Sequence, residues 1–247
     1  MQINWGDIDI DLKDRLEPFL SDLNQDIPTP VNAIYLTGPS ARGEFSKANP
    51  EINLLMIFDE IDTNLLDHIS KLGRKYGTKG LRAPLLLTPE YLGNAHDVFP
   101  IEFLSLKTSH ILLYGENGLD QVSIDSSHLR LQCERELRSW RLQLRQGYLR
   151  SAGDTAWLSN LFLEGVADIF PLLRAILVLL EGNPDAANTA SLYRLEEKSG
   201  IDLSCIMKIW ELRKAGKKLP KDKVFETYDL WEKALAELVQ KVDGLNA

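Results

Sequence analysis

The sequence is short of cysteine and histidine, and this scarcity excludes several classes of protein. Its 247 residues include 2 cysteines and 4 histidines. Cys133 and Cys205 are too few for a disulfide framework or a cysteine-rich zinc site. The histidines are isolated and have no metal-ligand spacing. Both cysteines fall in helical patterns, so we expect buried free thiols and a reducing, cytoplasmic setting.

Long apolar runs and an excess of basic residues are also missing. The longest apolar run, Ile169 to Leu180, is shorter than a bilayer span and contains Pro171 and Arg174. The first residues are acidic, whereas a secretion signal is basic and then apolar. The net charge of −8 argues against a protein that coats nucleic acid by neutralising phosphates. We therefore expect no membrane partner, and nucleic acid is not expected as a partner.

What remains is ordinary globular composition, with 44% hydrophobic and 26% charged residues. Residues 1–125 hold 10 basic and 19 acidic side chains, whereas residues 126–247 hold 18 and 17. This change of charge indicates two domains. Helical and strand patterns mix in the first part, and only helical patterns occur in the second. We predict an α+β protein: a mixed-sheet domain over 1–125 and an all-helical bundle over 126–247.

The periodicity of apolar residues gives the individual elements. The expected strands are 31–37, 52–58, 82–88, 101–106 and 109–114. The expected helices of the first domain are 11–23 and 65–76, with a short one at 89–92. Those of the second domain are 127–151, 154–181, 189–198, 203–215 and 222–243.

Polar residues follow the first expected strand and precede the second. Gly38 allows a tight turn, and Pro39 suits the first position of a helix whose free N–H groups would attract an anion. Glu51 and Asn53 stand at the head of the second strand, where alternation places them on one face. Glu102 lies inside the expected strand 101–106. A carboxylate there is costly unless it is paired, hydrogen-bonded or metal-bound.

Gly38, Ala41-Arg42-Gly43, Glu51-Ile52-Asn53 and Glu102 together make residues 30–118 resemble the nucleotidyltransferase superfamily, which includes DNA polymerase beta and the aminoglycoside nucleotidyltransferases. The helical part is similar to the second domain of the aminoglycoside-modifying branch. The resemblance implies transfer of a nucleoside monophosphate from ATP or another nucleoside triphosphate to a hydroxyl acceptor. It implies that Gly38, Ser40 and Arg42 line the phosphate site. It also implies catalysis by Glu51, Asn53 and Glu102, with Mg²⁺ held by Glu51 and Glu102, and a homodimer is compatible with it.

The departures from the family pattern occur at the positions that bind phosphate and metal in the family. Pro39 replaces the serine that holds a phosphate, and Ser40 offers a hydroxyl one position late. Glu51 and Asn53 replace two aspartates, and Asn53 removes a negative charge from the residue that would bridge two Mg²⁺ ions. These changes predict impaired transfer. The alternative is a non-catalytic pseudoenzyme that binds a nucleotide or a partner protein in its cleft.

Two groups of basic residues in the helical half can each be interpreted in two ways. The arginines at 138, 141 and 145 either face a triphosphate or form a solvated surface balanced by Glu134 and Glu136. Five lysines between residues 214 and 223 form a loop that either touches RNA or a partner, or faces solvent. The half contains no histidine after residue 128, which excludes an Arg-x4–6-His ribonuclease motif.

Overall fold

The computed structural model describes residues 1–6, 8–45, 50–182 and 188–245. The chain divides into two compact units. The first contains Met1–His96 and Phe103–Ser123, and the second contains Asp97–Glu102 and Ile124–Ala247. The expected boundary between residues 125 and 126 assigns residues 97–102 to the first domain, whereas in the structure they pack with the helical unit.

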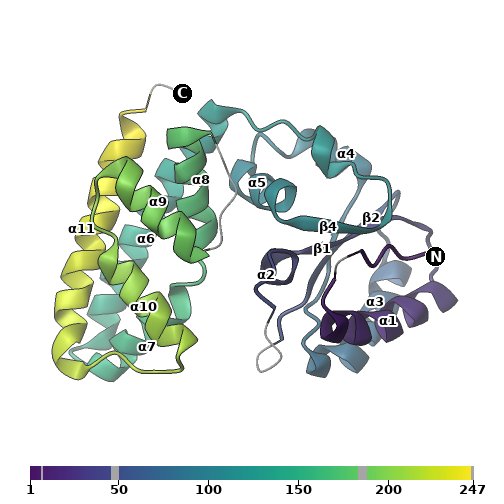
Figure 1. Ribbon diagram of the computed structural model, residues 1–247, viewed down its shortest axis with the longest axis horizontal. Helices are drawn as coiled ribbons and strands as arrows, with labels where there is room; N and C mark the ends of the chain where they lie inside the picture. The colour runs from purple at the N-terminus through teal and green to yellow at the C-terminus, as the bar shows by residue number, and fades with distance from the viewer. Residues whose placement is uncertain (7, 46–49, 183–187, 246–247) are drawn as a thin grey trace. The chain divides into compact units, whose positions relative to one another are not determined.

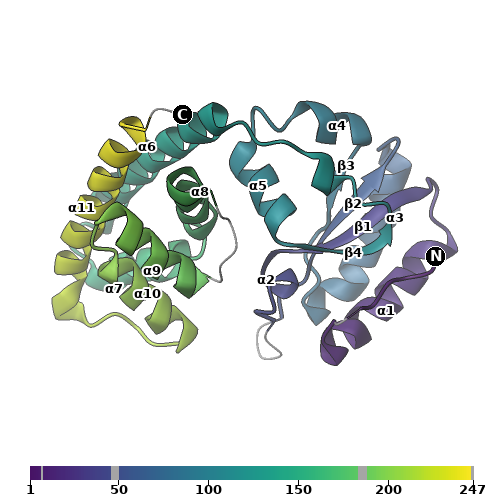
Figure 2. The same cartoon turned by 45° about the horizontal axis from the view of Figure 1, so that its top comes forward.

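The first unit is built on one mixed sheet of four strands in the order β3-β2-β1-β4 (Figures 1 and 2). β1 runs antiparallel to both of its neighbours, and β2 and β3 run parallel. The strands are β1 (Val31–Thr37), β2 (Asn53–Phe58), β3 (Leu85–Leu87) and β4 (His110–Gly115). The predicted α+β class with a mixed sheet is confirmed, although β3 is shorter than the expected 82–88.

Helices cover both faces of this sheet because β1 and β2 are apolar on both faces. α1 (Ile10–Gln25) and α3 (Thr63–Tyr76) pack on one face (Figure 2). Leu92 of α4 (Pro89–Asn94) and Leu106 of α5 (Pro100–Thr108) pack on the other. Together these helices enclose the two apolar layers of the first unit.

The expected strand 101–106 is wrong, because these residues form the helix α5. A short apolar run fits a buried strand and a buried helix equally well. Pro100 occupies the first helical position, which tolerates its missing N–H. The hydroxyl of Thr108 donates to the carbonyl of Leu104 at 2.8 Å, a bond of helical spacing. The carboxylate of Glu102 therefore lies on the first turn of a helix.

The second unit is helical throughout its described residues, and all the described strands belong to the first. The apolar pattern over 154–181, expected as one stretch, contains two helices that separate after Gly165. None of the described helices combines the length and apolarity needed to cross a bilayer. The helices are α6 (Ser126–Ser151), α7 (Thr155–Gly165), α8 (Phe170–Glu181), α9 (Asn188–Ser199), α10 (Ser204–Lys214) and α11 (Val224–Asp243).

Aromatic packing fills the core of this unit. Trp231 is 2% exposed, and its ring stacks on Phe162 with 5.4 Å between centroids. Cys133 and Cys205 are buried free thiols, as the sequence predicts. Burial raises the pKa of the Cys205 thiol to about 12 and raises that of Cys133 further. A thiol with such a pKa is a poor nucleophile, so both cysteines act as apolar core residues.

Ion pairs join α6 to α11 across the outside of this core. Arg141 and Arg145 both donate to Oε1 of Glu232, at 2.7 and 2.6 Å. Arg138 pairs instead with Glu134 on its own helix at 2.7 Å. The three arginines thus have partners within the helical unit, and Glu232 holds two of them.

We predict that Glu232→Gln lowers the free energy of unfolding by about 1–2 kcal/mol at pH 7, because two arginines lose a charged acceptor. Burial alone would raise the pKa of Glu232, but its bonds to Arg141 and Arg145 outweigh this and lower it. The stabilisation is therefore complete above the unfolded-state pKa and disappears as the pH falls through the folded-state pKa. Urea unfolding between pH 7 and 3 measures it.

Glu237→Gln is the matched control, because Glu237 lies on the same helix in a more exposed pair with Lys233 at 3.8 Å. This variant should change stability by less than about 0.5 kcal/mol. An equal loss in both variants, or a Glu232→Gln deficit that does not shrink in acid, would contradict the assigned role.

Candidate functional site

The end of β1 and the start of β2 meet at one end of the sheet. Because these strands are antiparallel, Thr37 lies directly opposite Asn53. The hydroxyl of Thr37 donates to the carbonyl of Asn53 at 3.3 Å. The chain then turns at once into α2 (Gly38–Ala41), a single helical turn. The strand pairing therefore brings together the two polar segments that the sequence singled out.

Gly38 is required at this turn for two reasons. Its φ of +69° lies in the left-handed region that residues with a side chain rarely adopt. A Cβ at this position would also lie 2.9 Å from Nδ2 of Asn53. The amide of Asn53 therefore lies directly against the backbone of Gly38, which explains why the turn has room for no side chain.

Ser40 is held inside the turn. It is 5% exposed, and its hydroxyl donates to the carbonyl of Glu51 at 2.8 Å. The preceding Pro39 occupies the first helical position, as expected. The proton of the Ser40 hydroxyl is thus committed to the chain that leads into β2. Phosphate contact by Ser40 stays a prediction and would require this bond to be replaced.

Arg42 follows α2 directly and is its C-cap residue. Its side chain is 14% exposed, and its Nη2 lies 3.4 Å from Oε2 of Glu44. Its Nε is buried and has no hydrogen-bond partner among the described residues. A buried donor without a partner is costly, so an anion bound at this turn would relieve that cost.

Glu51 stands at the other side of the turn beside a basic residue that the sequence did not single out. Its Oε1 lies 3.8 Å from Nε of Arg82, and both side chains are largely exposed. The backbone N–H of Arg82 donates to the carbonyl of Ile52 at 2.9 Å. Arg82 opens the segment that runs parallel to the start of β2. The sequence offered one indication of this residue, because Arg82 is the first residue of the expected strand 82–88.

Glu102 belongs to the helical unit, whereas the other predicted site residues belong to the first unit. Its Oε2 accepts a hydrogen bond from Nε2 of Gln132 at 2.8 Å. Oε1 of Gln132 also accepts from the backbone N–H of Ile101 at 2.8 Å. Gln132 is 5% exposed and satisfies both ends of its amide in this way. Gln132 fixes the orientation of the carboxylate, and nothing in the residue pattern indicated it.

The described residues do not fit a two-metal site. Among them, no three His, Cys, Asp or Glu side chains come together in a way that could hold a metal ion. Glu51 is paired with a guanidinium, and Asn53 presents a neutral amide to Gly38. Mg²⁺ prefers anionic oxygen ligands in a tight octahedral arrangement. Residues 51 and 53 therefore do not supply the pair of free carboxylates that two Mg²⁺ ions would require.

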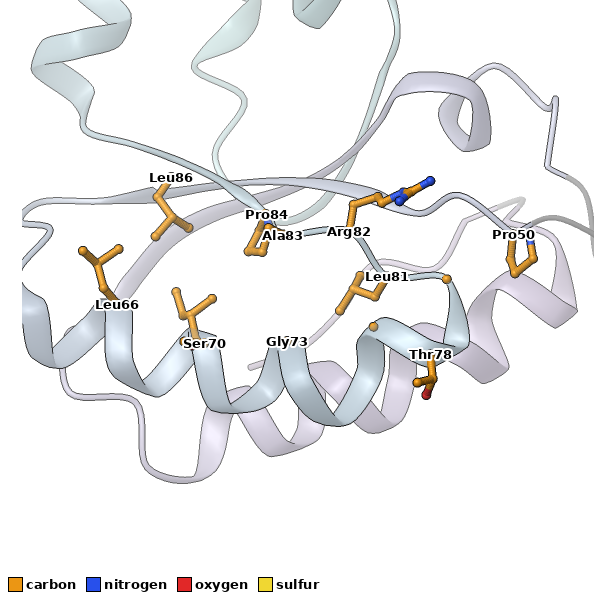
Figure 3. A pocket seen from close by; sticks show the side chains of 13 residues that line it. Pro50, Leu66, Ser70, Gly73, Thr78, Leu81, Arg82, Ala83, Pro84 and Leu86 are labelled. Atoms are coloured by element: carbon orange, nitrogen blue, oxygen red, sulfur yellow. The ribbon is translucent and has the colours of Figure 1, made fainter. Parts of the chain in front are cut away.

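A separate groove of about 770 Å³ lies between α3 and the chain that leads into β3 (Figure 3). Leu66, Leu81 and Leu86 contribute much of its lining, and the guanidinium of Arg82 points away from them. Ser70 adds a hydroxyl to this lining, so the walls are largely but not wholly apolar and suit a ligand with few polar groups. None of residues 38–42, which form the polar turn, lines the groove.

Comparison with known proteins shows the fold. No family model and no curated protein sequence matches the chain. A crystal structure of a spectinomycin adenyltransferase from Enterococcus faecialis, solved with ATP and spectinomycin, matches with a TM-score of 0.51 and 14% identity. The match covers 91% of this chain and 98% of that one. The chain thus has a nucleotidyltransferase-like fold, as its resemblance to that superfamily implies.

We predict that Gly38→Ala destabilises the protein more than Gly43→Ala does. Gly43 has a similar φ of +73°, but apart from its two chain neighbours no atom of the described residues lies within 4 Å of its Cβ position. Each alanine pays about 1–2 kcal/mol for left-handed backbone, and Gly38→Ala adds about 1 kcal/mol for the contact with Asn53. Urea unfolding of both variants measures the difference.

The contact itself is tested by a double-mutant cycle with Asn53→Ala, which removes Nδ2. In that background Gly38→Ala should cost no more than Gly43→Ala. An unchanged cost of Gly38→Ala would show that the amide of Asn53 does not constrain the turn.

Proposed function

We propose that the first unit, within the predicted domain 1–125, binds a nucleoside triphosphate at the turn between β1 and β2. In this proposal Gly38, Ser40 and Arg42 contact the phosphates. The supporting observation is the turn itself: Asn53 lies against Gly38, and Arg42 has a buried Nε that finds no partner among the described residues. The likeness in fold to an adenyltransferase solved with ATP supports ATP as the first ligand to test.

We further propose that binding needs no divalent cation and that transfer is impaired. Two-metal catalysis requires carboxylates that bridge and clamp the ions. At this turn one candidate ligand is a neutral amide, and the other, Glu51, is paired with Arg82. A bound triphosphate would replace Glu44 and Glu51 as the partner of Arg42 and Arg82, and the two guanidinium groups would then supply the positive charge without a metal.

Calorimetric titration with ATP and GTP, each with Mg²⁺ and with EDTA, tests this proposal. We expect binding whose Kd changes less than about threefold when Mg²⁺ is removed. Arg42→Met should weaken binding at least about tenfold, because it removes a charge-assisted donor. Arg74→Met, at an exposed arginine of α3, is the control and should leave the Kd unchanged. Absence of heat with either nucleotide would refute nucleotide binding.

Asn53→Asp tests the assignment of Asn53 as the changed metal ligand. The added carboxylate restores the charge that an ion-bridging residue carries, so this variant should bind ATP more tightly with Mg²⁺ than with EDTA. It should also lose affinity in EDTA, because the new charge repels phosphate. An Asn53→Asp variant that is as indifferent to Mg²⁺ as the natural chain would contradict this assignment.

Transfer to a hydroxyl acceptor is the second candidate function. The observation in its favour is Glu102, whose carboxylate Gln132 holds in one orientation. Transfer would form a bond from the acceptor oxygen to the α-phosphorus, break the bond to the leaving pyrophosphate and release the hydroxyl proton. Acceptor-dependent pyrophosphate release by the natural chain, abolished by Glu102→Ala, would establish this function and overturn the impaired reading.

A further inference from the structure

The loop between α10 and α11 concentrates positive charge in a chain of net charge −8. Residues 214–223 contain a single acidic residue, Asp222. Lys223 pairs with Glu226 at 2.8 Å, but no ion pair joins the other four lysines to a described residue. These four side chains are exposed. The lysines are Lys214, Lys217, Lys218, Lys221 and Lys223.

This loop has a fixed conformation. Gly216 adopts a φ of +62°, and its N–H donates to the carbonyl of Arg213 at 3.0 Å. The next N–H, that of Lys217, donates to Leu212 at 2.9 Å, which completes a Schellman cap on α10. Leu219 is 4% exposed and anchors the loop in the core. The lysines are therefore presented on an ordered backbone, which lowers the entropic cost of binding through them.

Aromatic rings follow the loop directly, one of them exposed and the other half-buried. The 3-10 turn Lys221–Lys223 leads into α11, where Phe225 and Tyr228 lie on one face at three-residue spacing. Tyr148 lies in the last turns of α6. The centroid of its ring is 4.6 Å from that of Tyr228 and 5.9 Å from that of Phe225. Tyr148 is 40% and Phe225 is 42% exposed. The backbone of the loop and the first turns of α11 lie at one end of the helical unit, beside α7 (Figures 1 and 2).

We propose that this surface binds single-stranded nucleic acid, with phosphates on the lysine loop and bases stacked on the aromatic rings. Unpaired lysines beside solvent-facing rings are the combination that single-strand binding uses, since every base has a face that can stack. An acidic peptide would use the lysines but would leave the rings without a role.

The net charge of the whole chain had set nucleic acid aside as a partner. That argument concerns long-range attraction, which is screened beyond about 8 Å at physiological ionic strength. A strand bound on the loop responds to the lysines within this distance. The proposal is independent of nucleotide binding at Gly38, because it uses residues of the other unit.

Fluorescence anisotropy of labelled 12-nucleotide oligouridylate and oligothymidylate, titrated with the full chain between 50 and 200 mM salt, tests the proposal. We expect saturable binding that weakens with salt. The variant K217E/K218E/K221E should bind at least about tenfold more weakly, and its salt slope should fall by about 2, as expected for three lost phosphate contacts. The two oligonucleotides distinguish RNA from DNA as the preferred strand.

The variant K71E/R74E/K241E is the matched control, because it makes the same change in net charge at exposed residues outside the loop sequence. It should keep at least half of the affinity. If both triple variants lost affinity for the oligonucleotides equally, net charge alone would explain the loss, and the proposal would be overturned.

Phe225→Ala tests the stacking contribution separately. Removing one stacking ring should weaken binding about tenfold without changing the salt slope. Tyr193→Ala, which removes a ring 59% exposed on α9, is the control and should bind as the natural chain does. Phe225→Leu keeps the apolar contact with α6 and loses only the ring, so it replaces Phe225→Ala if circular dichroism shows the latter to be unfolded.

Three further outcomes overturn the proposal. The first is no binding of either oligonucleotide at 50 mM salt. The second is binding that neither the lysine nor the Phe225 variants change. The third is binding of phosphatidylserine vesicles or of a polyglutamate peptide through the same lysines with greater affinity than either oligonucleotide, which would assign the surface to a membrane or to an acidic protein.

Discussion

The position of β1 at the centre of the sheet determines where the polar site of the first unit lies. Ile34, Tyr35 and Leu36 are fully buried, so both faces of the strand are covered. Both of its edges pair with antiparallel neighbours. The end of β1 therefore lies beside the start of each neighbour, and Thr37 is the common partner of Asn53 and His110. Residues far apart in the sequence meet at this point because of the strand pairing.

Gly38 and Asn53 determine the charge and the hydrogen-bonding groups at this end of the sheet. A glycine with positive φ lets the neighbouring side chain approach the backbone, and here the neighbour is a neutral amide. A carboxylate in the same place would repel a phosphate unless a cation lay between them. An amide has no such charge and can donate a hydrogen bond to a phosphate directly. Under the proposed function, a neutral amide at position 53 therefore supplies no metal ligand and also removes the reason for needing a metal.

The sequence predicted those parts of the fold in which local pattern and tertiary environment agree. The apolar runs at 31–37 and 52–58 are strands, and the turn at Gly38 follows from glycine and proline at fixed places. The run at 101–106 is a helix, because its six residues carry no period that separates the two states. The contacts of Arg82 and Gln132 were missed, since each depends on a partner that only the folded chain supplies.

The same distinction between local and overall properties governs charge. A net charge of −8 describes the molecule at long range, where salt screens it, and says little about a surface where charges are held in place. The arginines of α6 illustrate one outcome, because Glu134 and Glu232 neutralise Arg138, Arg141 and Arg145. The lysines at 214–221 illustrate the other: Leu219 and the cap at Gly216 hold their backbone in place, while their side chains form no ion pair among the described residues. Positive charge that the fold orders but does not pair is available to an anionic ligand, and the exposed rings beside it favour a ligand with bases.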